Sequence, residues 1–180
     1  LRVSAKLLPG DRVALLVPGS RSLVDAVISL LIRGIVPILL DHKLTPSERD
    51  QLISSLEPRL TVTESDGLEE LLLGWEPGDL PLTRPMHVTS GTTGTPKGVW
   101  CGLLSRPDAR AHFAEEVELW GFNDNDKNLV ISPLHHSAPL RFAIGTLLQG
   151  GTIMGFGAAG KQLAFDPGLI TAHIREQQPT

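Results

Sequence analysis

The sequence predicts an α/β protein with a mostly parallel sheet flanked by helices. Short apolar runs alternate with helix-like stretches along all 180 residues, which is the pattern of strand–helix–strand units. Turn residues also bracket the apolar runs. Pro9-Gly10 and Pro18-Gly19 enclose the first run, residues 13–17, whose unbroken apolar character is typical of a strand buried on both faces.

Each later element has its own signal. Residues 22–33 are apolar on nearly every face, as expected of a helix packed between a sheet and other elements, and Gly34 ends that helix. Thr45 and Glu48 form a capping box for the next helix, and Asp66 is expected to cap a short third helix. The expected strands are residues 13–17, 35–40, 60–63, 86–89, 128–131 and 152–154. The expected helices are residues 22–33, 46–56, 66–73, 105–120, 139–148 and a last one from residue 167.

Composition excludes several classes of function. Sixteen basic and twenty acidic residues give a net charge of −4, whereas a nucleic-acid-binding protein usually shows a basic excess. Residues 23–40 have the length of a membrane span, but Asp25, Arg33 and Pro37 interrupt them, so we expect no transmembrane segment. Cys101 is the single cysteine and has no partner for an internal disulfide, which favours a reducing, cytoplasmic location.

The segment Thr89-Ser90-Gly91-Thr92-Thr93-Gly94-Thr95-Pro96-Lys97-Gly98 follows an expected strand and carries the clearest chemistry. Glycines let backbone amides approach an anion, hydroxyls donate hydrogen bonds, and a lysine adds positive charge. A polyphosphate is therefore the natural ligand, and a polar surface turn is the structural alternative. The order is not that of a Walker loop, because Pro96 precedes Lys97 and a glycine follows it.

This order resembles the signature phosphate loop of the adenylate-forming enzymes, which include acyl-CoA synthetases, luciferases and the adenylation domains of peptide synthetases. Residues 8–14, 44–48, 133–138 and 147–152 are similar to other family motifs, in the required order. The resemblance implies an enzyme that joins a carboxylate to AMP with loss of pyrophosphate. The acyl group then passes to a thiol such as CoA.

The resemblance also implies roles for particular residues. Lys97 is expected near the leaving pyrophosphate, with Mg²⁺ sharing the charge, although no metal ligand can be assigned in this sequence. His136 matches the family histidine beside the acyl and CoA path. Two positions depart from the family pattern: His135 stands where an aromatic residue is common, and Gly19 where asparagine is frequent. The expected ATP phosphate-binding residues are Thr89, Ser90, Gly91, Thr92, Thr93, Gly94 and Lys97.

Residues 1–180 are expected to form part of an N-terminal AMP-binding domain, with the remainder of that domain and a mobile lid domain beyond Thr180. We expect such a piece to be inactive alone, and its truncated sheet edge to favour self-association. The motif around His136 resembles acyl-CoA synthetases more than amino-acid adenylation domains, so a fatty acid is the favoured carboxylic acid.

Three alternatives stay open at this point. The first is a nucleotide- or phosphate-binding module without catalysis, and the second is an amino-acid adenylation domain. The third is an NAD-binding fragment, because residues 155–160 fit the glycine fingerprint of dinucleotide-binding proteins. That fingerprint should open a helix directly, whereas here Asp166-Pro167 start the next helix late.

Overall fold

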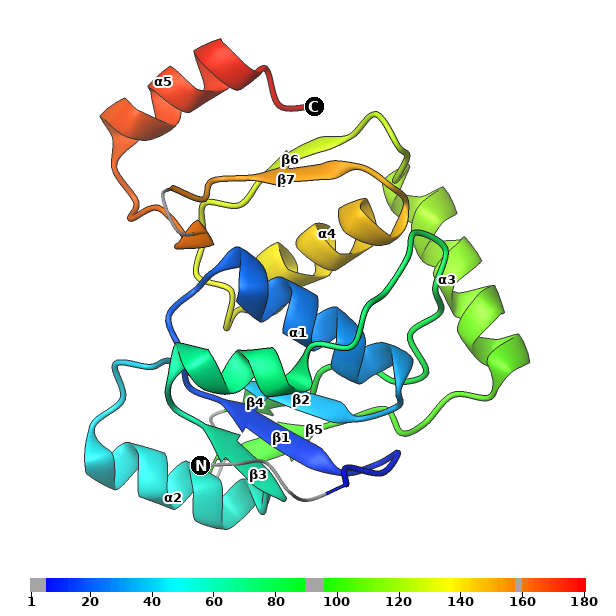
Figure 1. The fold of residues 1–180 in the computed structure, drawn as a ribbon, viewed down its shortest axis with the longest axis vertical. Coiled ribbons are helices and arrows are strands. Elements are labelled where there is room, and N and C mark those ends of the chain that lie inside the picture. The colour runs from blue at the N-terminus through cyan, green and yellow to red at the C-terminus, as the bar shows by residue number, and fades with distance from the viewer. Residues whose placement is uncertain (1–5, 90–95, 158–159) are drawn as a thin grey trace.

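The computed structural model describes residues 6–89, 96–157 and 160–180, and it confirms the α/β class (Figure 1). The strands are β1 (Arg12–Leu15), β2 (Val36–Leu39), β3 (Leu60–Val62), β4 (His87–Thr89), β5 (Lys97–Val99), β6 (Lys127–Leu129) and β7 (Thr152–Met154). The helices are α1 (Arg21–Ile32), α2 (Pro46–Leu56), the 3₁₀ helix η1 (Ser65–Leu71), α3 (Arg106–Trp120), α4 (Ser137–Leu148) and α5 (Pro167–Gln177).

Parallel pairing dominates the strands, as the sequence predicts. β1 lies between β2 and β3 in a parallel three-stranded sheet, and β6 pairs in parallel with β7. The exception is the antiparallel pair of β4 and β5. The sequence analysis expects no strand at β5 and assigns its residues to the phosphate loop. Gly98 explains this strand, since its lack of a side chain lets β5 lie against Met86 and Leu56.

The three-stranded sheet is covered on both faces, with α1 on one side and α2 on the other (Figure 1). Side chains alternate along a strand, so β1 and the residues after it supply both sides. Val13 and Leu15 belong to the core cluster of α1, whereas Ala14 and Leu16 belong to the cluster that contains Leu52 of α2. The unbroken apolar run in the sequence is therefore explained by burial on two faces.

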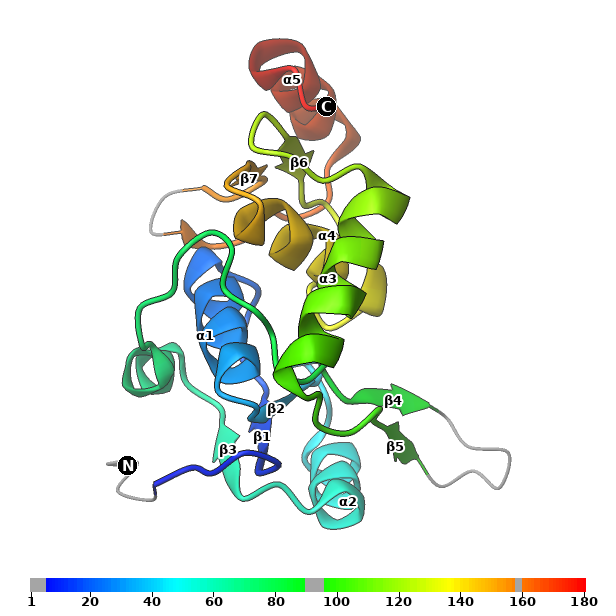
Figure 2. The ribbon, with the colours of Figure 1, turned by 90° about the vertical axis from the view of Figure 1, so that its right-hand side faces the viewer.

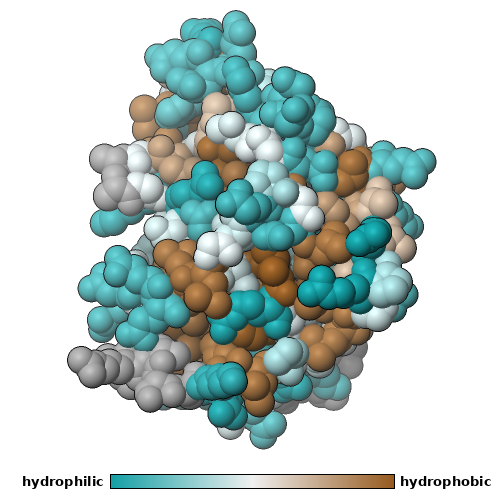
Figure 3. Space-filling view, turned by 45° about the vertical axis from the view of Figure 1, so that its right-hand side comes forward, coloured by the Kyte–Doolittle hydropathy of each residue, from teal (hydrophilic) through white to brown (hydrophobic). Residues whose placement is uncertain are grey.

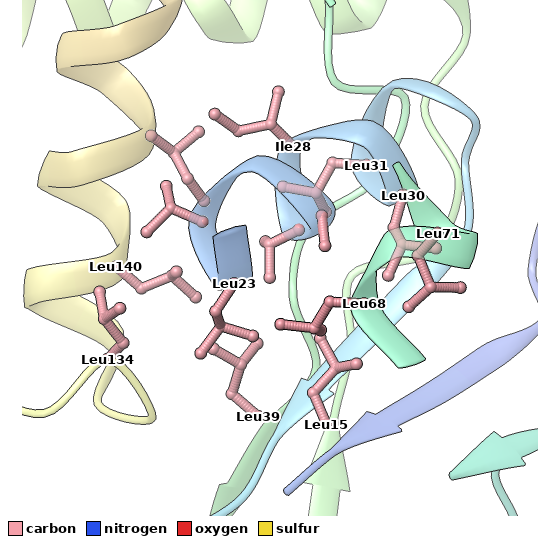
Figure 4. Packing of buried hydrophobic residues seen from close by; sticks show 14 of the residues in the cluster. Leu15, Leu23, Ile28, Leu30, Leu31, Leu39, Leu68, Leu71, Leu134 and Leu140 are labelled. Carbon is pink, nitrogen blue, oxygen red and sulfur yellow. The ribbon is translucent and has the colours of Figure 1, made fainter. Parts of the chain in front are cut away.

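Helix α1 is the centre of the larger core. Eight of its twelve residues are buried, and it packs against the sheet, η1 and α4. Figure 4 shows Leu15 and Leu39 pointing up from the strands toward Leu23, with Leu68 of η1 on one side and Leu140 of α4 on the other. An apolar helix of this kind is stable only where every side has a partner.

A second layer stands on the far side of α1. The strands β6 and β7 lie across α4, and α3 runs along the side of α4 (Figures 1 and 2). At the end of α3, Trp120 and Phe122 each make an edge-to-face contact with Phe142 of α4, at 5.0 Å and 5.7 Å between ring centroids. These contacts fix α3 against α4.

The outermost element is α5. It buries none of its residues, and the surface around it is hydrophilic, whereas apolar surface appears lower on the molecule (Figure 3). Within the described ranges, no helix is both long enough and apolar enough to cross a bilayer.

Several helix starts agree with the sequence analysis, and two differ. The caps at Thr45, Ser105 and Asp166 are present, and Thr45 forms the full capping box. Helix α4 begins at Ser137, two residues before the expected start at Pro139. Backbone N–H groups in the first turn have no partner within the helix, so Pro139, which has no N–H, fits there. The expected cap by Asp66 is wrong, since η1 is a short 3₁₀ helix without a side-chain cap.

Ser29 joins α1 to η1, and we expect Ser29→Ala to lower the free energy of unfolding by about 1–2 kcal/mol. The buried hydroxyl donates to the carbonyl of Leu71 at 3.0 Å and accepts from the amide of Leu73 at 2.9 Å. Urea denaturation measures the loss. The control is Ser54→Ala on the exposed side of α2, where a change below about 0.5 kcal/mol is expected. Equal effects of the two variants would contradict the role of Ser29.

Candidate functional site

The antiparallel pair of β4 and β5 holds both ends of the predicted phosphate loop. Thr89 and Lys97 lie directly opposite each other, and the Thr89 hydroxyl donates a long 3.4 Å hydrogen bond to the carbonyl of Lys97. Both side chains are exposed. The structure thus brings together the first and the last of the predicted phosphate-binding residues. Those between them, Ser90, Gly91, Thr92, Thr93 and Gly94, lie outside the described residues, and their role stays a prediction.

This hairpin is anchored to the three-stranded sheet. The amide of Met86 donates to the carbonyl of Pro37 in β2 at 3.0 Å, which joins the start of β4 to the sheet. On the other strand, the hydroxyl of Ser55 in α2 donates to the carbonyl of Pro96 at 2.8 Å. The base of the loop is therefore fixed by contacts from two directions.

A cleft of about 410 Å³ opens beside the hairpin, at the carboxyl end of β2, which is where ligands commonly bind in parallel sheets. His87 and Val88 of β4 line one wall, and His135 and His136 line the other. Because His87 and Thr89 are two residues apart on a strand, their side chains share one face. The structure thus places His136, the predicted acyl-path residue, across a cleft from the strand that leads into the phosphate loop.

A second cavity of about 480 Å³ adjoins the cleft and shares Asp41 and His135 with it. His135 packs against His136 with ring centroids 4.4 Å apart. Burial lowers the pKa of His135, His136 lowers it further, and Asp41 acts in the opposite direction. His135 therefore binds a proton less readily than a free histidine does. The sequence analysis did not assign His87 or Asp41 to the site, although both lie at the ends of expected strands.

The family of the chain follows from a comparison with known proteins. Residues 86–180, just over half of the sequence, match the model of the AMP-binding enzyme family. The chain belongs to the AMP-binding enzymes. The matched region includes the hairpin, His136 and everything that follows them.

Individual relatives agree with this assignment. A feruloyl-CoA synthase from an Amycolatopsis species is 28% identical over 204 residues, covering 98% of this chain and 39% of that protein. A 2-succinylbenzoate–CoA ligase from Bacillus licheniformis is 28% identical over 193 residues, covering 95% and 38%. The solved N-terminal subdomain of Klebsiella oxytoca NpsA, in complex with 3-hydroxyanthranilyl-AMSN, shares the fold with a TM-score of 0.69 at 22% identity, covering 97% and 46%. The chain spans about two fifths of the curated relatives.

Gly19, one of the two departures from the AMP-binding family pattern, has a structural reason. A Cβ atom at Gly19 would overlap the side-chain amide of Gln162. That amide cannot easily move, because its nitrogen donates to the carbonyl of Ser132 at 2.7 Å and the Gln162 backbone amide donates to the carbonyl of Gly19 at 2.8 Å. Gln162 therefore occupies the space that a larger residue at position 19 would need.

The described residues around Gly155 and Gly160 lack the arrangement of a dinucleotide-binding loop. The chain turns at Gly160, pairs Lys161 with Ser20 and Gln162 with Phe156, and begins its next α-helix only at Pro167. Ala158 and Ala159 lie outside the described residues. A dinucleotide fingerprint opens a helix directly, so the described part of this segment does not fit the NAD-binding alternative.

Because Gln162 fills the space beside Gly19, we expect Gly19→Ala to destabilise the protein by about 1–3 kcal/mol. In the double variant with Gln162→Ala, the cost of the added methyl should largely disappear. Thermal unfolding of the four proteins measures this coupling. Gly74→Ala is the matched control, since no atom lies within 4 Å of a Cβ there. A cost for Gly19→Ala that is independent of Gln162 would contradict the packing argument.

His87 should make stability depend on pH. Partial burial lowers its pKa below the usual value, and Arg141 and Arg84 lower it further. The unfolded chain therefore takes up the proton more readily than the folded chain. The stability that His87 contributes is full above the ordinary histidine pKa of the unfolded chain, and it is lost as the pH falls toward the lowered pKa of the folded chain. His135 acts in the same direction.

We expect the free energy of unfolding, measured with urea at pH 7.5 and 5.5, to fall less for His87→Gln than for the unmodified protein. His173→Gln on α5 is the control, and its fall should match that of the unmodified chain. An identical pH response of His87→Gln and the unmodified protein would refute the assignment.

Proposed function

We propose that this chain supplies the phosphate loop and part of the acyl path of an ATP-dependent acid–thiol ligase. The observation that carries the proposal is the hairpin that sets Thr89 opposite Lys97 beside the cleft of His136. Membership of the AMP-binding enzymes supports it, as do two relatives whose names state CoA ligation. Because the chain spans only part of those relatives, the activity belongs to the whole protein.

In the first half-reaction, a carboxylate oxygen of the acid forms a bond to the α-phosphorus of ATP. The bond from that phosphorus to the bridging oxygen breaks, and pyrophosphate leaves with the electron pair. Two anions must meet, so positive charge and hydrogen-bond donors have to stabilise the departing group. The ammonium group of Lys97 supplies the charge, and the Thr89 hydroxyl is placed to donate at the other end of the loop.

In the second half-reaction, a thiolate attacks the acyl carbon and AMP leaves. We assign CoA as the acceptor and His136 as a residue beside its path. The role of His136 rests on its place in the cleft lining. His136 is the residue before the first turn of α4, and its side chain makes no capping hydrogen bond to that helix. Its ring is thus available to a ligand.

Mg²⁺ would neutralise part of the polyphosphate charge when bound. Among residues 6–89, 96–157 and 160–180, no group of three or more acidic, histidine or cysteine side chains could hold a metal ion. The described residues therefore do not fit a dedicated metal site, and we assign no step to the ion.

The domain assignment and the acid are finer proposals. We assign residues 1–180 to the N-terminal part of an AMP-binding domain. A fatty acid, favoured by the sequence motif, stays a prediction, and the two relatives named above are named for ferulate and 2-succinylbenzoate instead. The second candidate, a phosphate-binding module without catalysis, would share the loop but would release no pyrophosphate.

Calorimetric titration of Mg-ATP tests the loop directly. We expect saturable binding that Lys97→Ala weakens about tenfold, because one charge-assisted contact to phosphate is lost. The control is Lys127→Ala, an exposed lysine on β6 in the opposite part of the molecule (Figure 1). Equal affinities of the Lys97 and Lys127 variants would overturn the role of Lys97.

A further inference from the structure

A small cavity of about 70 Å³ lies between α3 and α4, beside β4. Its floor is apolar and is formed by residues such as Leu31, Phe113 and Ile144. It shares His87, Ser137 and Leu140 with the cleft that contains His136. The cavity is therefore a side pocket of the proposed active-site cleft, reached past the strand that leads into the phosphate loop.

The wall of this side pocket carries an unbalanced positive charge. The carboxylate of Glu116 contacts the guanidinium of Arg84, and its Oε1 lies 3.5 Å from Nε of Arg141 and 3.8 Å from Nε2 of His112. One carboxylate thus faces two permanent cations. The other acidic group near His112, Glu115, has a side chain 79% exposed and contacts the outer side of the ring.

Two further observations indicate a positive environment and an unpaired polar atom in the pocket wall. After burial, the charges of Arg141 and Arg84 are the groups that lower the pKa of His87 at the junction with the cleft. In addition, Nε2 of His112 is buried and has no hydrogen-bond partner among the described residues. A protein gains from an anion at such a place, because charge-assisted hydrogen bonds to arginine are strong and often bidentate.

Aromatic packing holds α3 against α4 beside the side pocket. The edge-to-face contacts of Trp120 and Phe122 with Phe142 hold the end of α3 on α4. Gly145 of α4 lies so close to the Phe122 ring that a side chain there would overlap it. Pockets with an apolar lining and a few polar or charged groups are typical of small-molecule sites.

We propose that this side pocket receives the distal end of the acid substrate, and that Arg84 and Arg141 select an acid with a second anionic group. The proposal rests on the function proposed above. The side chains of Arg84 and Arg141 are 29% and 42% exposed and share the single carboxylate of Glu116. An alkyl tail would cover them without giving either guanidinium a new partner, which is unfavourable. The side pocket, at about 70 Å³, has roughly half the volume of an engineered cavity that binds benzene, which has about 150 Å³. Its size therefore suits a small terminal group of the acid.

Binding of glutarate and valerate, which have the same number of carbons, tests the proposal. With the ¹⁵N-labelled 180-residue chain, we expect glutarate to shift amide resonances of α3 and α4 with an affinity at least about tenfold above that of valerate. Arg141→Gln should abolish the preference, and Arg141→Lys should keep part of it. Arg110→Gln, an exposed arginine on α3, is the matched control and should leave the preference unchanged.

Three results would overturn the proposal. These are equal affinities for the two acids, no saturable binding of glutarate, and a preference that survives Arg141→Gln. A phosphate of ATP offers similar anionic chemistry, so each variant is also titrated with Mg-ATP. If Arg141→Gln weakens Mg-ATP and not glutarate, the arginines serve phosphate and the proposal is wrong. If Mg-ATP fails to bind while the glutarate preference holds, the proposed ligase function fails instead.

Discussion

The burial of β1 on both faces is the constraint on which the rest of this structure depends. Val13 and Leu15 need the α1 core, and Ala14 and Leu16 need the α2 side, so neither helix can leave without exposing half of the strand. Each fully buried aliphatic side chain contributes roughly 1.5–3 kcal/mol. Because β1 pairs with β2 and β3 in parallel, this burial also fixes where the carboxyl ends of the strands meet.

The functional region is built outward from that fixed edge. Met86 joins the hairpin to β2, and the hairpin holds the two ends of the predicted phosphate loop at Thr89 and Lys97. On the other side, α4 rests on α1 and presents His136 at its start. A short, fixed base under a glycine-rich segment suits phosphate chemistry, which depends on positioning donors more than on reactive side chains.

The charged groups are distributed unevenly around the cleft. Burial lowers the pKa of His135 between the two cavities, whereas Arg84, Arg141 and Glu116 gather at the side pocket between α3 and α4. Local charges of this kind differ among proteins that share a fold, and function is decided at the site. The side pocket is therefore the part of the described structure that bears most on the proposed choice of acid.

Much of the candidate site could be predicted from the sequence because its signals are local. The loop between Thr89 and Gly98, the caps at Thr45, Ser105 and Asp166, and the two-sided apolar run of β1 each depend on residues a few positions apart. The short strand β5 has no such local signal. Gly98 lies against Met86 and Leu56, and this packing becomes visible only in the folded chain.

What the sequence alone determined is the α/β class and the family resemblance, and it predicts where a phosphate loop lies. Only the tertiary structure decided that Arg84 meets Glu116 across 32 positions of sequence, that Gln162 fills the space at Gly19, and that His136 faces β4 across a cleft. The physical reason is range: caps and apolar runs act through neighbouring residues, whereas charge clusters and cavities form only where packed elements bring distant residues together.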